Sequence, residues 1–78
     1  MSGRFLPLTL VRPHRLVTLV SITSGQELRR RLTEMGLNKG VRLRVVHSSQ
    51  SGPCIVSVGD TRLVLGRGMA QNILVKED

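Results

Sequence analysis

One stretch of the chain places its hydrophobic positions with the period of a helix. Leu28, Leu32 and Met35 follow one another at spacings of four and three residues, so they share one face of a helix. The opposite face carries three consecutive arginines. We therefore expect a helix from about Ser24 to Met35, with its apolar side chains directed into a core.

Both ends of this helix carry typical boundary residues. The Ser24 hydroxyl can accept a hydrogen bond from a free N–H group of the first turn, and Glu27 can reach back to the Ser24 N–H, which is the capping-box pattern. Gly36 supplies the left-handed conformation that ends many helices. Leu37 follows, where it can fold back onto the last turn.

The rest of the chain has the short alternating or β-branched runs that are typical of strands. Tight turns separate them, with Gly59-Asp60 of the two-residue kind that closes hairpins. A segment with two glycines is too short for a standard helix and predicts one helical turn near Arg67 to Gln71. The runs predict five strands, at Leu16 to Ile22, Val41 to His47, Pro53 to Val58, Thr61 to Leu65 and Asn72 to Val75.

No strand is predicted in the N-terminal segment. Leu6, Leu8 and Leu10 alternate with other residues, which indicates a short extended segment that lies on the core. Residues 1–5 are expected to be flexible.

Five short strands with one helix after the first indicate a small, closed or nearly closed barrel. We expect a single, mainly β domain over residues 1–78, with the helical turn before its last strand.

Charge is the strongest compositional feature. Twelve Lys and Arg against five Asp and Glu give a formal net charge of +7. Such an excess attracts nucleic acid, anionic lipid surfaces or acidic protein patches without selecting among them.

Phe5 is the only aromatic residue, so we expect an aliphatic core. Cys54 is the only cysteine, so we expect a reducing, cytoplasmic location. No apolar run approaches the roughly 20 residues of a membrane span, and membrane insertion is not expected.

The candidate chemical groups do not combine into a catalytic or metal site. Glu27 and Glu34 have arginine neighbours that keep carboxylates ionised, whereas a general acid needs the opposite environment. The inward phase of Cys54 indicates a core thiol, and His14 and His47 belong to different elements. Zinc spacings and phosphate loops are absent from the sequence. We expect no enzyme activity, no bound metal and no cofactor.

Two motifs carry a resemblance to a known family. The chain resembles the FeoA family over about Leu8 to Val75, through the runs LRRRLTEMGLNKG and LVLGRGMAQNILV. The C-terminal domain of iron- and manganese-responsive repressors belongs to the same superfamily. The resemblance implies an SH3-like barrel, and a small cytosolic protein that works with FeoB, the GTPase-coupled ferrous iron permease of bacteria.

One turn departs from the pattern of the family. Relatives often carry Pro-Gly-Glu in the turn before the first strand, whereas here Pro13 is followed by His14 and Arg15. Because His tolerates a positive φ better than most residues other than glycine, we expect the turn to survive.

The function expected from these observations is docking. The protein would bind the cytosolic side of an FeoB-like permease, be recruited to the inner face of the membrane through that partner, and support or regulate Fe²⁺ transport.

One alternative is a small basic barrel that binds RNA or DNA. The lack of aromatic residues for base stacking argues against this alternative. Another is a stand-alone regulatory domain related to metal-responsive repressors. The oligomeric state stays open between a monomer and a weak oligomer. The candidate contact residues are Arg29, Arg30, Leu37, Arg67 and Met69.

Overall fold

The computed structural model of the protein describes residues 3–23, 25–49 and 51–77. Within these residues six strands form one antiparallel sheet in the order β1-β6-β2-β3-β4-β5. The elements along the chain are β1 (Arg4–Pro7), the 3-10 helix η1 (Leu8–Leu10), β2 (Leu16–Ile22), α1 (Gln26–Glu34), β3 (Arg42–His47), β4 (Cys54–Val58), β5 (Thr61–Leu65), α2 (Arg67–Ala70) and β6 (Ile73–Glu77).

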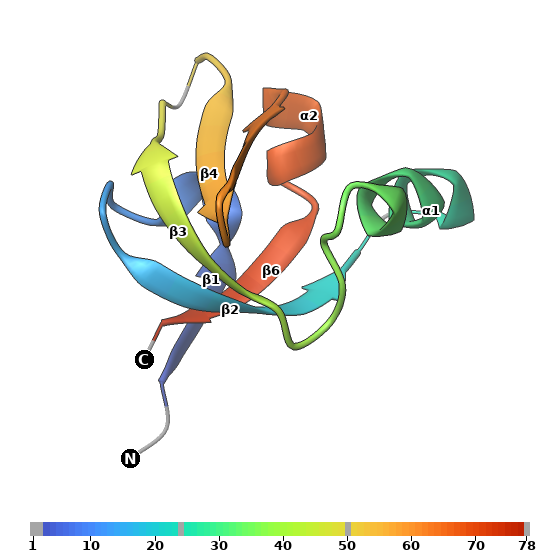
Figure 1. Ribbon diagram of the computed structural model, residues 1–78, viewed down its shortest axis with the longest axis horizontal. Coiled ribbons are helices and arrows are strands. Elements are labelled where there is room, and N and C mark those ends of the chain that lie inside the picture. Colours follow the sequence, from blue (N-terminus) through green and yellow to red (C-terminus); the bar gives the residue numbers. More distant parts are fainter. Residues whose placement is uncertain (1–2, 24, 50, 78) are drawn as a thin grey trace.

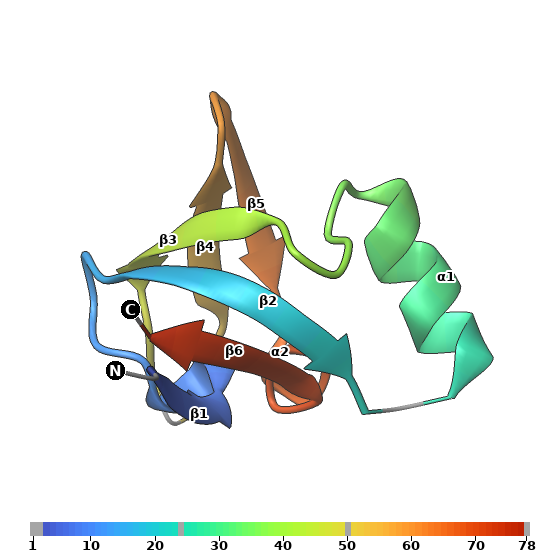
Figure 2. The ribbon, with the colours of Figure 1, turned by 90° about the horizontal axis from the view of Figure 1, so that it is seen from below.

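The sheet is strongly curled, and α1 stands beyond the end of β2 in both views (Figures 1 and 2). The short helix α2 leads into β6 and packs against η1. None of the helices in the described ranges is long and apolar enough to cross a membrane. The five predicted strands, the helix after the first of them and the helical turn before the last are all present.

The sixth strand, β1, was not predicted. It pairs with β6, and its register places Arg4 opposite Glu77 and Leu6 opposite Val75. These partners come from the two ends of the sequence, so no local pattern signals the pairing. The expectation of a flexible start is therefore wrong for Arg4 and Phe5, which form the first half of a strand, whereas residues 1 and 2 lie outside the described residues.

The extended segment expected from Leu6 to Leu10 is present at Leu6 and Pro7, in β1, but the expectation is wrong for Leu8 to Leu10. The ladder ends at Pro7, which has no N–H to donate to a further strand pair. The chain then turns into η1, which the Val11 N–H closes by donating to the Leu8 carbonyl at 3.2 Å. Leu8 is therefore fully buried, while Leu10 is 57% exposed.

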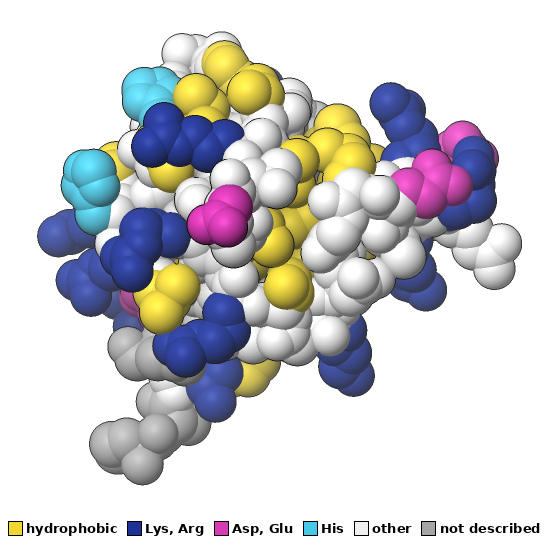
Figure 3. All heavy atoms as spheres, in the orientation of Figure 1, with side chains coloured by type: hydrophobic (Ala, Val, Ile, Leu, Met, Phe, Trp, Pro, Cys, Tyr) yellow, Lys and Arg dark blue, Asp and Glu magenta, His cyan; other side chains and the backbone are white. Residues whose placement is uncertain are grey.

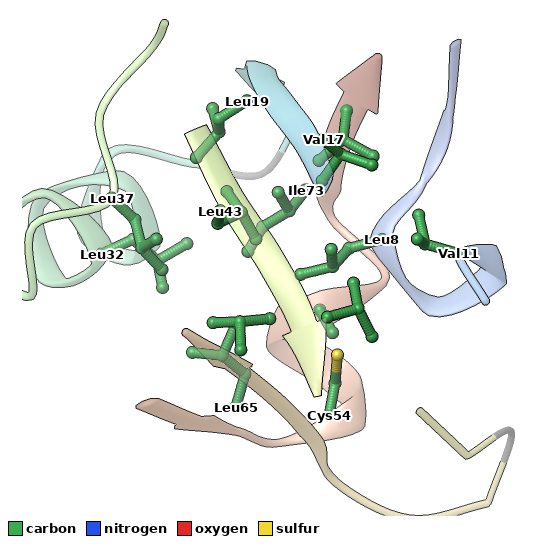
Figure 4. Close-up of a cluster of buried hydrophobic side chains, with 14 of the residues drawn as sticks. Leu8, Val11, Val17, Leu19, Leu32, Leu37, Leu43, Cys54, Leu65 and Ile73 are labelled. Atoms are coloured by element: carbon green, nitrogen blue, oxygen red, sulfur yellow. The ribbon is translucent and has the colours of Figure 1, made fainter. Parts of the chain in front are cut away.

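The core is aliphatic, as the composition predicted. Leu32, Leu43 and Val45 are buried as their patterns required, and the described residues include no buried polar or charged side chain. Side chains from the curled sheet, η1 and α1 meet in this core (Figure 4). The buried set is Leu8, Val11, Val17, Leu19, Ile22, Leu32, Leu37, Leu43, Val45, Cys54, Val56, Leu65, Ala70, Ile73 and Val75.

Strand β2 departs from simple alternation near its end. Val17 and Leu19, on one face of the strand, are buried, but Ile22 is buried as well. The pairing with β6 shifts register between Leu19 and Ser21, which is a β-bulge. The extra residue reverses the phase of the strand, so both Leu19 and Ile22 reach the core.

The turn before β2 is retained despite its unusual sequence. His14 has a φ of 74°, the left-handed conformation that glycine usually provides. Its N–H donates to the Val45 carbonyl at 2.6 Å, and its carbonyl accepts from Arg44 Nη1 at 2.9 Å. These two contacts to β3 hold the residue in its conformation.

Helix α1 begins one residue later than the sequence pattern indicated. The N-cap is Gly25, which offers no side-chain hydrogen bond, and the expected cap Ser24 lies outside the described residues. Glu27 therefore occupies the second helical position, and the predicted capping box, which involves Ser24, lies outside the described residues. The negative charge of Glu27 still lies in the first turn, where it complements the helix dipole.

The end of α1 is a Schellman motif, which confirms the prediction for Gly36. The Gly36 N–H donates to the Thr33 carbonyl at 3.0 Å, and the Leu37 N–H donates to the Leu32 carbonyl at 2.9 Å. Gly36 has a φ of 95°, which is strained for any residue with a Cβ. Leu37 and Leu32 supply the hydrophobic contact that accompanies the motif (Figure 4).

We expect Gly36→Ala to lower the free energy of unfolding by about 1–2 kcal/mol, because alanine must adopt the left-handed conformation there. A Cβ at Gly36 meets no atom within 4 Å, so the cost is conformational. Gly68→Ala is the matched control, since Gly68 has equal space, no positive φ and a helical position. Urea denaturation followed by circular dichroism measures both. Equal effects of the two substitutions would contradict this explanation of the helix end.

Candidate protein-docking site

A groove lies between α1 and the end of β2. Its volume is about 310 Å³. Buried Leu19 and Leu37 contribute to its lining, whereas the side chains of Arg29 and Lys39 are exposed and give it a positive charge. The residues that line it are Leu19, Val20, Ser21, Ile22, Arg29, Thr33, Leu37, Asn38 and Lys39.

Backbone and side-chain contacts hold the two walls of this groove in place. Arg29 Nη2 donates to the Ile22 carbonyl at 3.2 Å, which joins the helix to the last residue of β2. On the other side, the Gly40 N–H donates to the Leu19 carbonyl at 2.8 Å. The Leu19 N–H in turn donates to the Val41 carbonyl at 2.9 Å. The loop after α1 is therefore fixed against β2, and the groove is preformed.

Arg30, a predicted contact residue, lies on the solvent face of α1 between two carboxylates. Its Nη2 is 2.8 Å from Glu27 Oε2, and its Nη1 is 3.1 Å from Glu34 Oε2. The three residues lie three and four positions apart on one helix, so their side chains can reach one another. Because exposed ion pairs contribute little to stability, a partner's carboxylate can take the place of either one.

Leu37, another predicted contact residue, is only 1% exposed. The prediction that it anchors a partner is corrected here, because the Schellman motif turns its side chain into the core. It shapes the floor of the groove but offers almost no surface of its own. Met69 is partly buried against the same core, so only part of its side chain is accessible.

The remaining predicted residues, Arg67 and Met69, lie on α2 at the same end of the sheet as α1. The register pairs Ile22 of β2 with Ile73 of β6, so α1 begins where α2 ends. Just beyond that pair, the Thr23 N–H donates to the Asn72 carbonyl at 2.8 Å, and Thr23 Oγ1 donates to the same carbonyl at 3.2 Å. The structure thus brings the predicted residues to one end of the molecule.

Only two of the nine residues that line the groove, Arg29 and Leu37, were predicted as contact residues, and three of the missed ones come from α1 and the turn after it. Thr33 lies one helical turn after Arg29, so its place on this face followed from the spacing of the helix. Asn38 and Lys39 belong to the turn after α1, which the sequence analysis treated only as a connection. Their proximity to β2 depends on the hydrogen bonds of Leu19, which no local pattern shows.

The reactive groups lie away from this groove. Cys54 is buried in the core, and burial raises the pKa of its thiol, so the thiol stays protonated at neutral pH. In the described ranges no three His, Cys, Asp or Glu side chains come close enough together to hold a metal ion. What the groove offers is recognition: apolar contact on its floor and positive charge at its rim.

Comparison with known proteins gives consistent matches across nearly the whole chain. The FeoA domain family model matches residues 6–77. A relative named Fe(2+) transport protein A, from Methanocaldococcus jannaschii, is 34% identical over 71 residues, which are 91% of this chain and 85% of that protein.

Solved structures match the same architecture. The crystal structure of an iron uptake regulatory protein (FeoA) has a TM-score of 0.89 and 33% identity, over 96% of this chain and 100% of the other. A manganese-dependent transcriptional repressor has a TM-score of 0.88 at 22% identity, over 100% of this chain and 44% of the repressor, and this likeness shows the fold alone. The expected mainly β, SH3-like fold is confirmed.

Proposed function

Because this chain belongs to the FeoA domain family, we propose that it is a non-catalytic cytoplasmic protein that docks on an FeoB-like permease and supports or regulates Fe²⁺ transport. The ferrous ion is the cargo of the permease and does not need a site on this chain. The accessory protein contributes a surface that the permease recognises.

The observation that carries this proposal is the preformed groove between α1 and β2. An apolar floor with a cationic rim fits a partner segment that has an apolar side chain flanked by acidic residues. Arg29 and Lys39 stand at that rim, and Arg30 lies on the adjacent helix face. A groove of about 310 Å³ takes one or two side chains, so the interaction is expected to be weak and transient.

We expect Arg29→Glu to weaken binding to the cytosolic fragment of an FeoB-like permease by roughly tenfold or more, because a like charge then faces the partner's acidic residues. Fluorescence anisotropy at two salt concentrations measures this, and affinity should fall as salt rises. Arg62→Glu, which makes the same charge change at an exposed position of β5, is the matched control and should change affinity by less than about twofold.

Two outcomes of this experiment would overturn the proposal. Equal losses at Arg29 and Arg62 would mean that net charge, and not the groove, drives the binding. Tight binding to a random-sequence RNA, with no binding to the permease fragment, would favour the nucleic-acid alternative.

A further inference from the structure

A second basic surface lies at the opposite end of β2 from the docking groove. Arg4, Arg12 and Arg15 line a hollow of about 350 Å³ together with Leu6, Leu10 and Glu77. We call this the arginine hollow. Its residues lie in β1, in η1 and the turn that follows it, just before β2 and at the end of β6, so they are scattered in the sequence.

Strand pairing brings these groups together. Glu77 is opposite Arg4 in the β1–β6 pair and opposite Val17 in the β2–β6 pair. Arg15 lies two residues before Val17, and its Nε is 4.0 Å from Glu77 Oε2. Glu77 therefore lies between an arginine of β1 and an arginine that precedes β2.

The hollow has more positive charge than its carboxylate can neutralise. Three guanidinium groups face one carboxylate, so the net charge is 3 − 1 = +2. Arg15 makes only a long ion pair with Glu77. Within the described part of the chain, the side chains of Arg4 and Arg12 make no hydrogen bond or ion pair. Two forked donors are thus available for the oxygens of an anion.

An exposed apolar side chain lies beside these arginines. Leu10 lines the hollow and is 57% exposed. It is one of the three large hydrophobic residues that are exposed in the described part of the chain. Lys and Arg side chains interspersed with hydrophobic ones are visible on the side of the molecule away from α1 (Figure 3).

We propose that the arginine hollow binds the phosphate headgroups of anionic phospholipids and holds the protein directly on a membrane surface. Guanidinium groups pair with lipid phosphates, while Leu10 enters the boundary between headgroups and acyl chains. Nucleic acid fits this surface less well, because a single aromatic residue gives no stacking platform for successive bases.

The position of the hollow makes this contact compatible with docking. Leu19, the first residue of β2 that lines the groove, follows Arg15 of the hollow by four residues, so about 13 Å of extended chain separates the two sites. A protein that lies on the bilayer through the hollow therefore keeps α1 and the groove free. The lipid contact goes beyond the proposed function and does not depend on it, because its test contains no permease.

Co-sedimentation of the full chain with vesicles tests the proposal. We expect binding to phosphatidylcholine vesicles with about 30 per cent phosphatidylglycerol, and none to pure phosphatidylcholine. Replacing Arg4, Arg12 and Arg15 together with Gln should weaken the binding on the order of a hundredfold. The matched control replaces Arg29, Arg30 and Arg31 with Gln, which removes the same charge from α1, and should weaken it by less than about threefold, because α1 lies beyond the screening length.

Two single substitutions keep the test valid if the triple variant unfolds. Arg12→Gln removes no contact of the described structure and should weaken vesicle binding by roughly fivefold. Leu10→Ser should also weaken it by roughly fivefold, because an apolar side chain no longer enters the bilayer.

Three results would overturn the assignment to lipid. The first is an equal loss for the two triple variants, which would make the binding an effect of net charge. The second is vesicle binding that millimolar inorganic phosphate abolishes and that Leu10→Ser leaves unchanged, which would assign the hollow to a free phosphate. The third is binding of random-sequence RNA through the same arginines without any vesicle binding.

Discussion

Leu32→Ala is expected to lower the free energy of unfolding by about 2–5 kcal/mol, as truncation of a buried leucine does when the cavity left behind cannot collapse. Leu32 is fully buried and packs against Leu37, so its loss also removes the contact that ends α1. A domain of this size has roughly 4–12 kcal/mol of stability in total. Urea denaturation followed by circular dichroism measures the change, since the chain has neither Trp nor Tyr for fluorescence.

Leu28→Ala provides the matched control for this substitution. The two leucines lie one helical turn apart, and the sequence pattern gave them the same role. The structure separates them, because Leu28 is only partly buried. Its truncation should therefore cost roughly 1 kcal/mol. If Leu28→Ala destabilised the protein as much as Leu32→Ala, α1 would not be oriented as described.

Leu8→Ala is expected to have an effect of the same size, about 2–5 kcal/mol. Leu8 is fully buried, and it comes from η1, which packs against β6 and α2. Its truncation leaves a cavity between elements from the two ends of the chain. Denaturation by urea at equilibrium again gives the difference in free energy.

Leu10→Ala is the control for Leu8, two residues away in the same 3-10 helix. Because Leu10 is 57% exposed, its truncation should change the free energy of unfolding by less than about 0.5 kcal/mol. Similar losses at both positions would show that η1 packs differently. A neutral result also establishes that variants of Leu10 can be used in the vesicle experiment without a folding defect.

The parts of this fold that depend on neighbouring residues were predicted well. The helix end at Gly36, the hairpin turn at Gly59-Asp60 and the alternation of Leu43 and Val45 each depend on residues close in sequence. In each case, local conformation and burial of one face favour the same structure. Sequence reasoning is reliable where these two requirements agree.

The parts that depend on distant contacts were missed or misplaced. Strand β1 forms because it pairs with β6, and the sequence around Arg4 does not indicate that partner. The spacing of Leu6, Leu8 and Leu10 resembles a strand, but the ladder ends at Pro7 and the chain turns into η1. Ile22 is buried because of a bulge that only the pairing with β6 creates.

In the candidate sites, too, the features that depend on neighbouring residues were predicted and those that depend on distant contacts were not. Arg29 and Arg30 were identified because one helix presents them both, and the structure places them at the groove and on the face beside it. The arginine hollow was not predicted, because its three arginines meet only through the pairing of β1, β6 and β2. Burial of Leu37 also required the geometry of the helix end, which composition does not supply.

The pairing of β1 with β6 also determines where fused segments emerge. Arg4 and Glu77 are register partners and both line the arginine hollow, so a tag, a reporter protein or a neighbouring domain attached before β1 or after β6 leaves the barrel beside that hollow. Figure 2 shows the start of β1 near the end of β6. Fusions at both positions therefore obstruct the same surface. A circular permutant that joins the start of β1 to the end of β6 by a short linker and opens the Gly59-Asp60 turn moves the attachment point to the β4–β5 hairpin, away from the hollow.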